Sequence, residues 1–273
     1  MNAALRLFTE YGALSRVLTR RDMYSAAIAT LSNAPEILQS GKLTALDAAM
    51  SRTMTVHFDN SQIVLPMADI DRILAKRKDS PTFGSIREIY ARNCYLRRLR
   101  PNTPVRRVLD LGANRGMFSI LALIALGADT VVGVEPTSDY EEPYRLLLEA
   151  NRCDPARAPR YTRFVSSPTA ERENPAQSVS IPTILKDQGI ERFNLVKMDI
   201  EGHERAVFSE PEWLASVDTI CMELHPATGD LSLIPEALGR YGFTYTFTDQ
   251  HGRVASGADA TFLYASCTGE LAA

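Results

Sequence analysis

The spacing of apolar residues changes once along the 273-residue chain. Up to about residue 104, apolar positions such as Leu14, Val17 and Leu18 recur at intervals of three and four, as on amphipathic helices. From Val105 onward, short apolar runs rich in β-branched residues alternate with segments of helical spacing. We therefore divide the chain into an N-terminal helical and hairpin cap region, 1–104, and a second domain, 105–273.

The N-terminal region is predicted to contain helices and one β-hairpin. Two or three helices are expected over residues 3–50, a hairpin over 53–66, and further helices over 69–78 and 82–100. Asp59 and Asn60 separate the two short runs of the hairpin, and both residue types favour turns. An exposed apolar stripe on the first helices would suit a subunit contact, so we expect a homodimer.

Strands and helices alternate in the second domain. The predicted strands cover residues 106–112, 130–136, 160–167, 193–202, 217–224, 242–249 and 260–266, with helices over 116–126, 141–152, 181–188, 203–208 and 231–241. Such alternation favours a parallel sheet with right-handed crossovers. No helix separates the last two strands, so one of them should be antiparallel. The expected fold is α/β and Rossmann-like, with a mostly parallel seven-stranded sheet.

Composition places the chain among ordinary globular proteins. Apolar residues make up 45% and charged residues 23%. No apolar run approaches the roughly 20 residues that a membrane span requires, and the N-terminus lacks the unbroken apolar segment of a signal peptide. We expect a cytoplasmic protein with no membrane partner.

Charge is distributed unevenly about an overall net charge of -3. Residues 1–104 carry 15 Lys and Arg against 9 Asp and Glu, whereas residues 105–273 carry 15 against 24. The basic residues are scattered along predicted helices. They lack the interleaved aromatic residues that many nucleic-acid-binding surfaces have. We therefore expect no nucleic-acid partner.

A glycine-bearing turn follows the first strand of the second domain. Asp110, Gly112, Asn114 and Gly116 form a DxGxxxG pattern, and ligands of doubly wound sheets bind at this end of the first strand. Glycine lets the backbone N–H groups approach a ligand closely. Asn114 stands where the dinucleotide fingerprint places its second glycine, which disfavours a pyrophosphate. S-adenosylmethionine suits the turn better, with Asp110 accepting from its ammonium group.

Glu135 supplies a second acidic position, at the end of the next strand and 25 residues after Asp110. A carboxylate there can accept hydrogen bonds from both ribose hydroxyls of a nucleoside. The two acids and the antiparallel strand favour a methyltransferase over a nicotinamide-dependent oxidoreductase. A nicotinamide-dependent oxidoreductase with a similar sheet remains the alternative function.

Acidic and basic side chains follow the fourth strand in the sequence VKMDIEGHE. Lys197 and Asp199 share one face of that strand, and Asp199 reaches its carboxyl end. His203 follows in the next turn and is a candidate general base, because histidine titrates near neutral pH. Glu201 and Glu204 are either site residues or first-turn acids that complement a helix dipole. Lys197 is interpreted as an electrostatic partner of Asp199.

The fifth strand ends in MELHP, which places Glu223 and His225 two residues apart. By strand alternation both point toward the same edge of the sheet as Asp199. Asp199, Glu223 and His225 are therefore candidate ligands for Mg²⁺ or Mn²⁺, with a substrate hydroxyl completing the shell. Alternatively they hold the substrate directly, with His225 or His203 as the base. The predicted catalytic residues are these three and His203.

Several segments together resemble the FkbM family of S-adenosylmethionine-dependent methyltransferases. They are VLDLGANRGMFSI, VVGVEP, LLLEANRC, NLVKMDIEGHERAVF and MELHP, and the most specific is KMDIEGHE. The resemblance covers about residues 105–266 and implies methylation of hydroxyl oxygens on sugars and natural products. It places Asp110, Gly112, Asn114, Gly116 and Glu135 on cofactor-binding positions, and it places Ser166 near the adenine.

The sequence thus predicts an O-methyltransferase that uses S-adenosylmethionine and takes part in natural product biosynthesis. Its acceptor would be a small molecule with a hydroxyl group, such as a sugar or a glycosylated or polyketide product. A non-catalytic binding protein of the same fold is a further alternative. Retention of Asp199, His203, Glu223 and His225 argues against it, because a binding protein has no need of them.

Overall fold

A computed structural model describes residues 3–77, 81–100, 103–225, 231–269 and 271–272. The chain folds as two compact units, each built from separate segments. The first comprises Met1–Asn93, Arg115–Ala125 and Asp139–Asp154, and the second comprises Cys94–Asn114, Leu126–Ser138 and Pro155–Ala273. The division of the sequence after residue 104 stays a prediction.

The first unit contains the predicted helices and hairpin. Its elements are α1 (Ala3–Leu14), α2 (Arg20–Ser32), α3 (Ala34–Ser40), α4 (Thr44–Ala49), β1 (Thr53–Phe58), β2 (Ser61–Pro66), α5 (Met67–Leu74), α6 (Phe83–Ser85), a π-helix (Ile86–Ala91), α7 (Met117–Ile124) and α8 (Glu141–Ala150). Strands β1 and β2 pair antiparallel, with Val56 opposite Ile63. Asp59 adopts a φ of 49°, as the tight turn between them requires. The hairpin prediction is confirmed.

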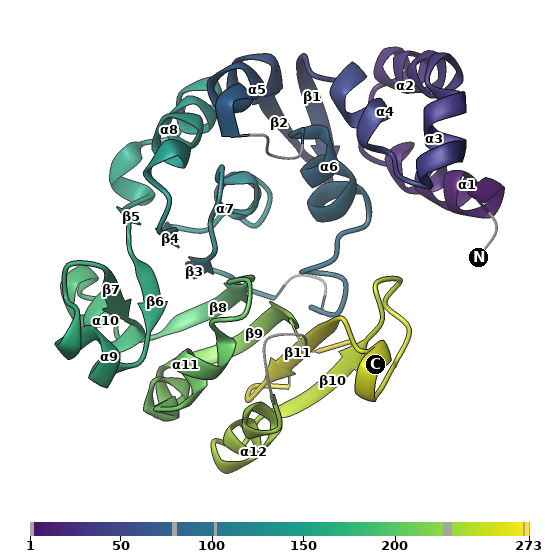
Figure 1. Ribbon diagram of the computed structural model, residues 1–273. Coiled ribbons are helices and arrows are strands. Elements are labelled where there is room, and N and C mark those ends of the chain that lie inside the picture. The colour runs from purple at the N-terminus through teal and green to yellow at the C-terminus, as the bar shows by residue number, and fades with distance from the viewer. Residues whose placement is uncertain (1–2, 78–80, 101–102, 226–230, 270, 273) are drawn as a thin grey trace. The chain divides into compact units, whose positions relative to one another are not determined.

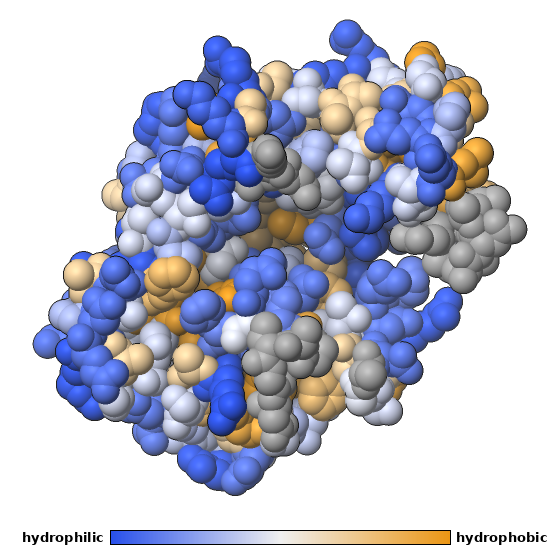
Figure 2. Space-filling view, viewed as in Figure 1, coloured by the Kyte–Doolittle hydropathy of each residue, from blue (hydrophilic) through white to orange (hydrophobic). Residues whose placement is uncertain are grey.

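Apolar side chains are exposed on the first helices of this unit. Tyr24, Ile28 and Leu31 lie three and four residues apart on α2, and each is at least 65% exposed. Figure 2 shows apolar side chains gathered along the edge that α2 and α3 form. This is the apolar stripe that the sequence predicted, and the homodimer stays a prediction.

The helix predicted over residues 82–100 is wrong in its second half. Helical structure ends at Ala91, and Asn93 has a left-handed φ of 49° that the helix cannot continue through. Residues 94–98 follow as turns. The break places Tyr95 outside the helix.

The second unit contains the seven-stranded sheet. Its strands are β3 (Arg107–Leu111), β4 (Thr130–Val134), β5 (Arg160–Tyr161), β8 (Phe193–Met198), β9 (Val217–Glu223), β10 (Thr244–Thr248) and β11 (Phe262–Ser266), in the order β10-β11-β9-β8-β3-β4-β5. β11 pairs antiparallel with both β9 and β10, and the other pairs are parallel. The predicted Rossmann-like fold is confirmed.

The strand predicted over residues 160–167 is in fact two strands. Only β5 joins the large sheet, whereas β6 (Phe164–Ser166) pairs in parallel with β7 (Ser178–Ser180) in a small sheet of its own. Ser167 then caps the helix α9 (Pro168–Glu173) by accepting from the Ala170 N–H. The break falls at Thr162 and Arg163, and the Ser167 cap begins the next helix directly after β6.

Helices α10 (Ile181–Gln188), α11 (Glu204–Phe208) and α12 (Leu233–Arg240) belong to the same unit. Figure 1 shows α11 and α12 along one side of the strands β8 and β9. Phe208 and Leu238 from these helices join a core cluster with Val196 and Ile220 from the strands, and all four are at most 2% exposed. Among the described residues, no helix is long and apolar enough to cross a bilayer.

The sheet brings three strand ends together. Leu111 pairs with Met198, and Met198 pairs with Met222, so β3, β8 and β9 end at one edge. Gly112, Asp199 and Glu223 stand at or just beyond these ends. Polar residues from three separate parts of the sequence are thereby placed close together.

Candidate active site

The glycine turn after β3 is folded back onto the end of β4. The N–H groups of Gly112 and Ala113 both donate to the Val134 carbonyl, and Gly112 has a φ of 73°. Asn114 is also left-handed, with a φ of 46°, and its carbonyl accepts from Arg160 at 3.0 Å. The turn uses the backbone conformations that glycine and asparagine tolerate best.

Gly112 also packs directly against the end of β8. The Asp199 N–H donates to the Leu111 carbonyl at 3.0 Å. A Cβ atom on Gly112 would lie 1.7 Å from the Asp199 carbonyl oxygen, so no side chain fits there. Gly116, in the other unit, has a φ of 91°, and a Cβ on it would lie 2.4 Å from the Tyr144 ring. Close packing therefore explains both glycines of the pattern.

Glu135 joins the turn to the end of β4. Its Oε2 accepts from the Asn114 N–H at 3.1 Å, and its Oε1 accepts from the Thr137 N–H at 3.0 Å. The residue is 7% exposed. Each carboxylate oxygen has a second lone pair, so both can still accept from a diol. Glu135 thus fits the predicted ribose-binding role and also stabilises the turn.

Replacement of Glu135 by glutamine should weaken binding of S-adenosylhomocysteine by about 10- to 100-fold, because one acceptor oxygen becomes an N–H donor facing backbone N–H groups. Calorimetric titration measures the effect. The exposed Glu173 provides a matched Glu→Gln control that should leave affinity unchanged. Equal affinities in Glu135→Gln and the wild type would remove the predicted role.

Lys197 is a buried cation at the centre of the strand ends. Its Nζ donates to the Gly112 carbonyl at 2.8 Å and lies 3.2 Å from Asp110 Oδ1 and 4.0 Å from Asp199 Oδ2. Burial alone lowers the pKa of the Lys197 ammonium, but Asp110 and Asp199 outweigh burial and hold that pKa above its usual value. Lys197 is therefore a charged partner of Asp199, as predicted, and also of Asp110, and it is unsuited to act as a base.

The Asp110 carboxylate forms a buried ion pair with Lys197. Its side chain is fully buried. A contact between Asp110 and the ammonium group of the cofactor stays a prediction. The contact in the structure links Asp110, near the end of β3, to Lys197 on the neighbouring strand β8.

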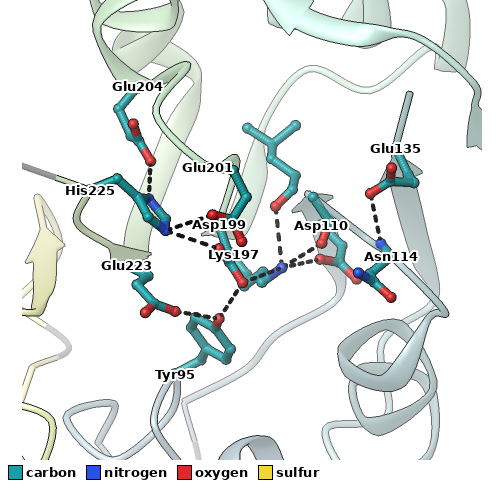
Figure 3. A network of polar contacts seen from close by, with 12 residues as sticks. Tyr95, Asp110, Asn114, Glu135, Lys197, Asp199, Glu201, Glu204, Glu223 and His225 are labelled. Carbon is teal, nitrogen blue, oxygen red and sulfur yellow. Dashed lines mark hydrogen bonds and ion pairs between the residues drawn. The ribbon is translucent and has the colours of Figure 1, made fainter. Parts of the chain in front are cut away.

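Asp199 and His225 lie in one network of polar contacts (Figure 3). Asp199 Oδ2 accepts from the Tyr95 hydroxyl at 2.8 Å, and Asp199 Oδ1 lies 3.8 Å from His225 Nε2. His225 Nδ1 lies 2.6 Å from Glu204 Oε1. Glu201 Oε2 lies 3.5 Å from Nε2, and its side chain is 86% exposed. The His225 ring thus has a carboxylate near each nitrogen, with Glu204 near Nδ1 and Asp199 and Glu201 near Nε2.

These carboxylates change the ionisation of His225. The hydrogen bond to Glu204, together with the charges of Glu204, Asp199 and Glu201, outweighs burial and raises the pKa of the His225 imidazole to about 9. The ring is therefore mostly an imidazolium at neutral pH. Its neutral form is a stronger base than an ordinary histidine side chain.

The remaining predicted residues take different places. His203 stacks on Phe164, with 5.2 Å between ring centroids, and its Nδ1 lies 3.3 Å from the Ile200 carbonyl. Glu223 Oε2 lies 3.5 Å from the Tyr95 hydroxyl. Ser166 lies at the end of β6, outside the seven-stranded sheet. Its contact with adenine stays a prediction.

Three donors in the network are spaced as metal ligands. One ligand atom from each of Asp199, Glu201 and His225 lies within 4.8 Å of the others. The predicted metal set contained Glu223 where this group contains Glu201. Glu201 is brought there by a turn in which Glu201 and Gly202 both have positive φ values, 52° and 99°.

Tyr95 and the inward position of Glu204 were missed by the sequence analysis. Tyr95 contacts Asp199 and Glu223, and its ring lies 5.3 Å from Lys197 Nζ. The helical pattern of the sequence continues past Asn93, so Tyr95 was placed in the predicted helix and not near Asp199. Glu204 was recognised as a possible site residue, but its position gave no sign of its burial.

Comparison with known proteins decides the family. The profile described as "Methyltransferase FkbM domain" matches residues 110–245. The chain belongs to the FkbM methyltransferase family. The matched segment includes the glycine turn, Glu135, Asp199, His225 and Glu204, whereas Tyr95 lies before it. A search of curated protein sequences gives no significant match.

The solved structures with similar folds are distant from this chain in sequence. The N-terminal domain of human METTL16 in complex with SAH is 15% identical, with coverage of 59% of this chain and 61% of that one and a TM-score of 0.39. A putative SAM-dependent methyltransferase from Streptococcus mutans is 12% identical, with coverage of 79% and 55% and a TM-score of 0.46. Precorrin-6y C5,15-methyltransferase from Geobacter metallireducens is 14% identical, with coverage of 64% and 86% and a TM-score of 0.43. The chain thus spans about three fifths of the METTL16 domain.

The family and the fold are those of S-adenosylmethionine-dependent methyltransferases. The residues fit this cofactor, because Glu135 offers buried acceptor oxygens beside the glycine turn. A nicotinamide-dependent oxidoreductase does not belong to this family. The FkbM assignment therefore replaces that alternative.

Proposed function

We propose that this FkbM protein is an O-methyltransferase acting on the hydroxyl of a small molecule, with a sugar or a glycosylated or polyketide natural product as the acceptor. The observation that carries the proposal is the Asp199–His225 pair. Asp199 directly follows β8, whose last residue, Met198, pairs with Leu111 just before the glycine turn, and His225 follows the end of β9. Such a pair can orient a hydroxyl and accept its proton.

Bound S-adenosylmethionine supplies an electrophilic methyl group. The side chains then have to hold the acceptor oxygen and remove its proton, since an alcohol is a weak nucleophile at neutral pH. We assign His225 Nε2 as the proton acceptor and Asp199 as the group that orients the hydroxyl. His203 is the less suitable base, because its ring is stacked on Phe164 and has no recorded contact with Asp199 or His225 among the described residues.

The rate should rise with pH if His225 is the base. Because only the neutral ring can accept a proton, kcat/KM should increase about tenfold per pH unit below the His225 pKa of about 9 and level off above it. Initial rates measured between pH 6.5 and 10 test this. A rate that falls over the same range would instead assign the charged ring as a hydrogen-bond donor and Asp199 as the base.

A divalent cation is the second means of proton removal that this network supports. Asp199, Glu201 and His225 have donor atoms close enough to hold Mg²⁺ or Mn²⁺, and such an ion would lower the pKa of a bound hydroxyl. If the reaction uses one, chelation should abolish activity, and added Mg²⁺ or Mn²⁺ should restore it. Full activity after chelation and gel filtration would dispose of the metal.

The acceptor class can be tested directly. The protein is incubated with a labelled methyl donor and a panel of sugars, glycosides and polyketides, with amines and nucleic acid as further acceptors. The acidic residues around Asp199 disfavour polyanionic acceptors, so label should be transferred to neutral hydroxyl compounds. Binding of the cofactor without transfer to any compound would support the non-catalytic alternative.

A further inference from the structure

Glu204 is the first residue of α11, but its carboxylate does not face solvent. The residue is 0% exposed, whereas a first-turn acid that only complements a helix dipole can stay in water. Its Oε1 accepts from the Gly202 N–H at 3.3 Å and lies 2.6 Å from His225 Nδ1. The side chain therefore turns inward toward His225.

Burial makes the contact with His225 necessary. A carboxylate without solvent is costly unless a cation and hydrogen-bond donors compensate it. Within the described part of the chain, His225 is the basic side chain recorded in contact with Glu204. Glu204 Oε2 has no hydrogen-bond partner there. The carboxylate thus depends on the imidazole for most of its compensation.

The contact also determines which nitrogen carries a proton. A carboxylate oxygen only accepts, so Nδ1 must be the donor in a bond to Glu204. In the neutral ring the lone pair is then on Nε2, the nitrogen that lies 3.8 Å from Asp199 Oδ1 and 3.5 Å from Glu201 Oε2. The opposite tautomer would place a lone pair against Glu204 and could not accept the acceptor's proton at Nε2.

We propose that Glu204 is a positioning residue that holds His225 through a buried Nδ1–H hydrogen bond and so presents Nε2 to the acceptor hydroxyl. This inference rests on the proposed function for the role of Nε2. During the reaction the hydroxyl proton moves to Nε2, while the Nδ1 proton stays between His225 and Glu204. Glu204 itself takes no proton and contacts no substrate.

The inference is tested by proton NMR together with kinetics on Glu204→Gln. A short bond between a buried carboxylate and an imidazole N–H should give a far-downfield proton resonance that exchanges slowly with solvent. His225→Gln assigns that resonance by removing it. Glu204→Gln should also remove it and lower kcat by about 10- to 100-fold, with the KM for S-adenosylmethionine within about twofold. The exposed Glu212 provides a control, Glu212→Gln, that should change neither quantity.

The two parts of the result separate this inference from the proposed function. The resonance in the wild-type protein needs no acceptor, so its presence and its loss in His225→Gln support the Glu204–His225 bond even if no hydroxyl compound is methylated or Glu204→Gln does not fold. Absence of the resonance from the folded wild type overturns the inference. An unchanged kcat in folded Glu204→Gln also overturns it, while loss of activity in His225→Gln would leave the proposed function in place.

Discussion

Replacement of His225 by glutamine should lower turnover by about 10²- to 10⁴-fold, the range that general acid–base catalysis contributes. The glutamine amide can still donate to the buried Glu204, so the fold should be kept, but it cannot accept the hydroxyl proton. Asp199→Asn should have an effect of similar size. Its amide keeps the volume but loses the charge beside Lys197 and His225.

Cofactor affinity distinguishes this chemical loss from a structural one. Both variants should bind S-adenosylhomocysteine within a few fold of the wild type, since the ribose contact is assigned to Glu135. His251, exposed in a turn after β10, provides a matched His→Gln control with full activity expected. Turnover retained in His225→Gln, or affinity lost in parallel with turnover, would contradict the assigned role.

Gly112→Ala should abolish cofactor binding and strongly destabilise the second unit. The added methyl would lie 1.7 Å from the Asp199 carbonyl oxygen, and relief requires separation of the glycine turn from the end of β8. The φ of 73° adds strain for any residue with a Cβ. Thermal unfolding with and without S-adenosylhomocysteine measures both effects.

A Gly127→Ala variant separates the effect of backbone strain from the effect of steric overlap. It has a φ of 65°, similar to that of Gly112, but a Cβ there meets nothing within 4 Å. Gly127→Ala should therefore cost only about 1 kcal/mol and leave cofactor binding intact. If Gly112→Ala behaves like Gly127→Ala, the close packing of the turn against Asp199 is not needed for binding.

Local patterns were sufficient to predict the sheet and the glycine turn. The alternation of strands and helices follows from hydrophobic periodicity, and the glycines and Glu135 stand at fixed distances along the sequence. These features depend on residues that are close in sequence, so they can be predicted from a single sequence. The same is true of Lys197 and Asp199, which share a face of β8.

The contacts of Asp199 and His225 depend on features that hydrophobic periodicity does not contain. Glu223 and His225 were paired by strand alternation, but β9 ends at Glu223. Beyond that point the two-residue period fails, so Glu223 lies near Tyr95 and His225 contacts Glu204. Glu201 reaches His225 only through a turn with positive φ, a local conformation that charge and hydropathy do not predict.

The account is tested most directly by locating the methyl group in the product. The protein is supplied with S-adenosylmethionine labelled with ¹³C in its methyl group, and the acceptor that gives turnover is analysed by carbon–proton correlation NMR. We expect a methoxy signal that forms with the wild type and is lost with His225→Gln. A label on nitrogen or carbon, or a methoxy signal that forms equally fast without His225, would contradict the account.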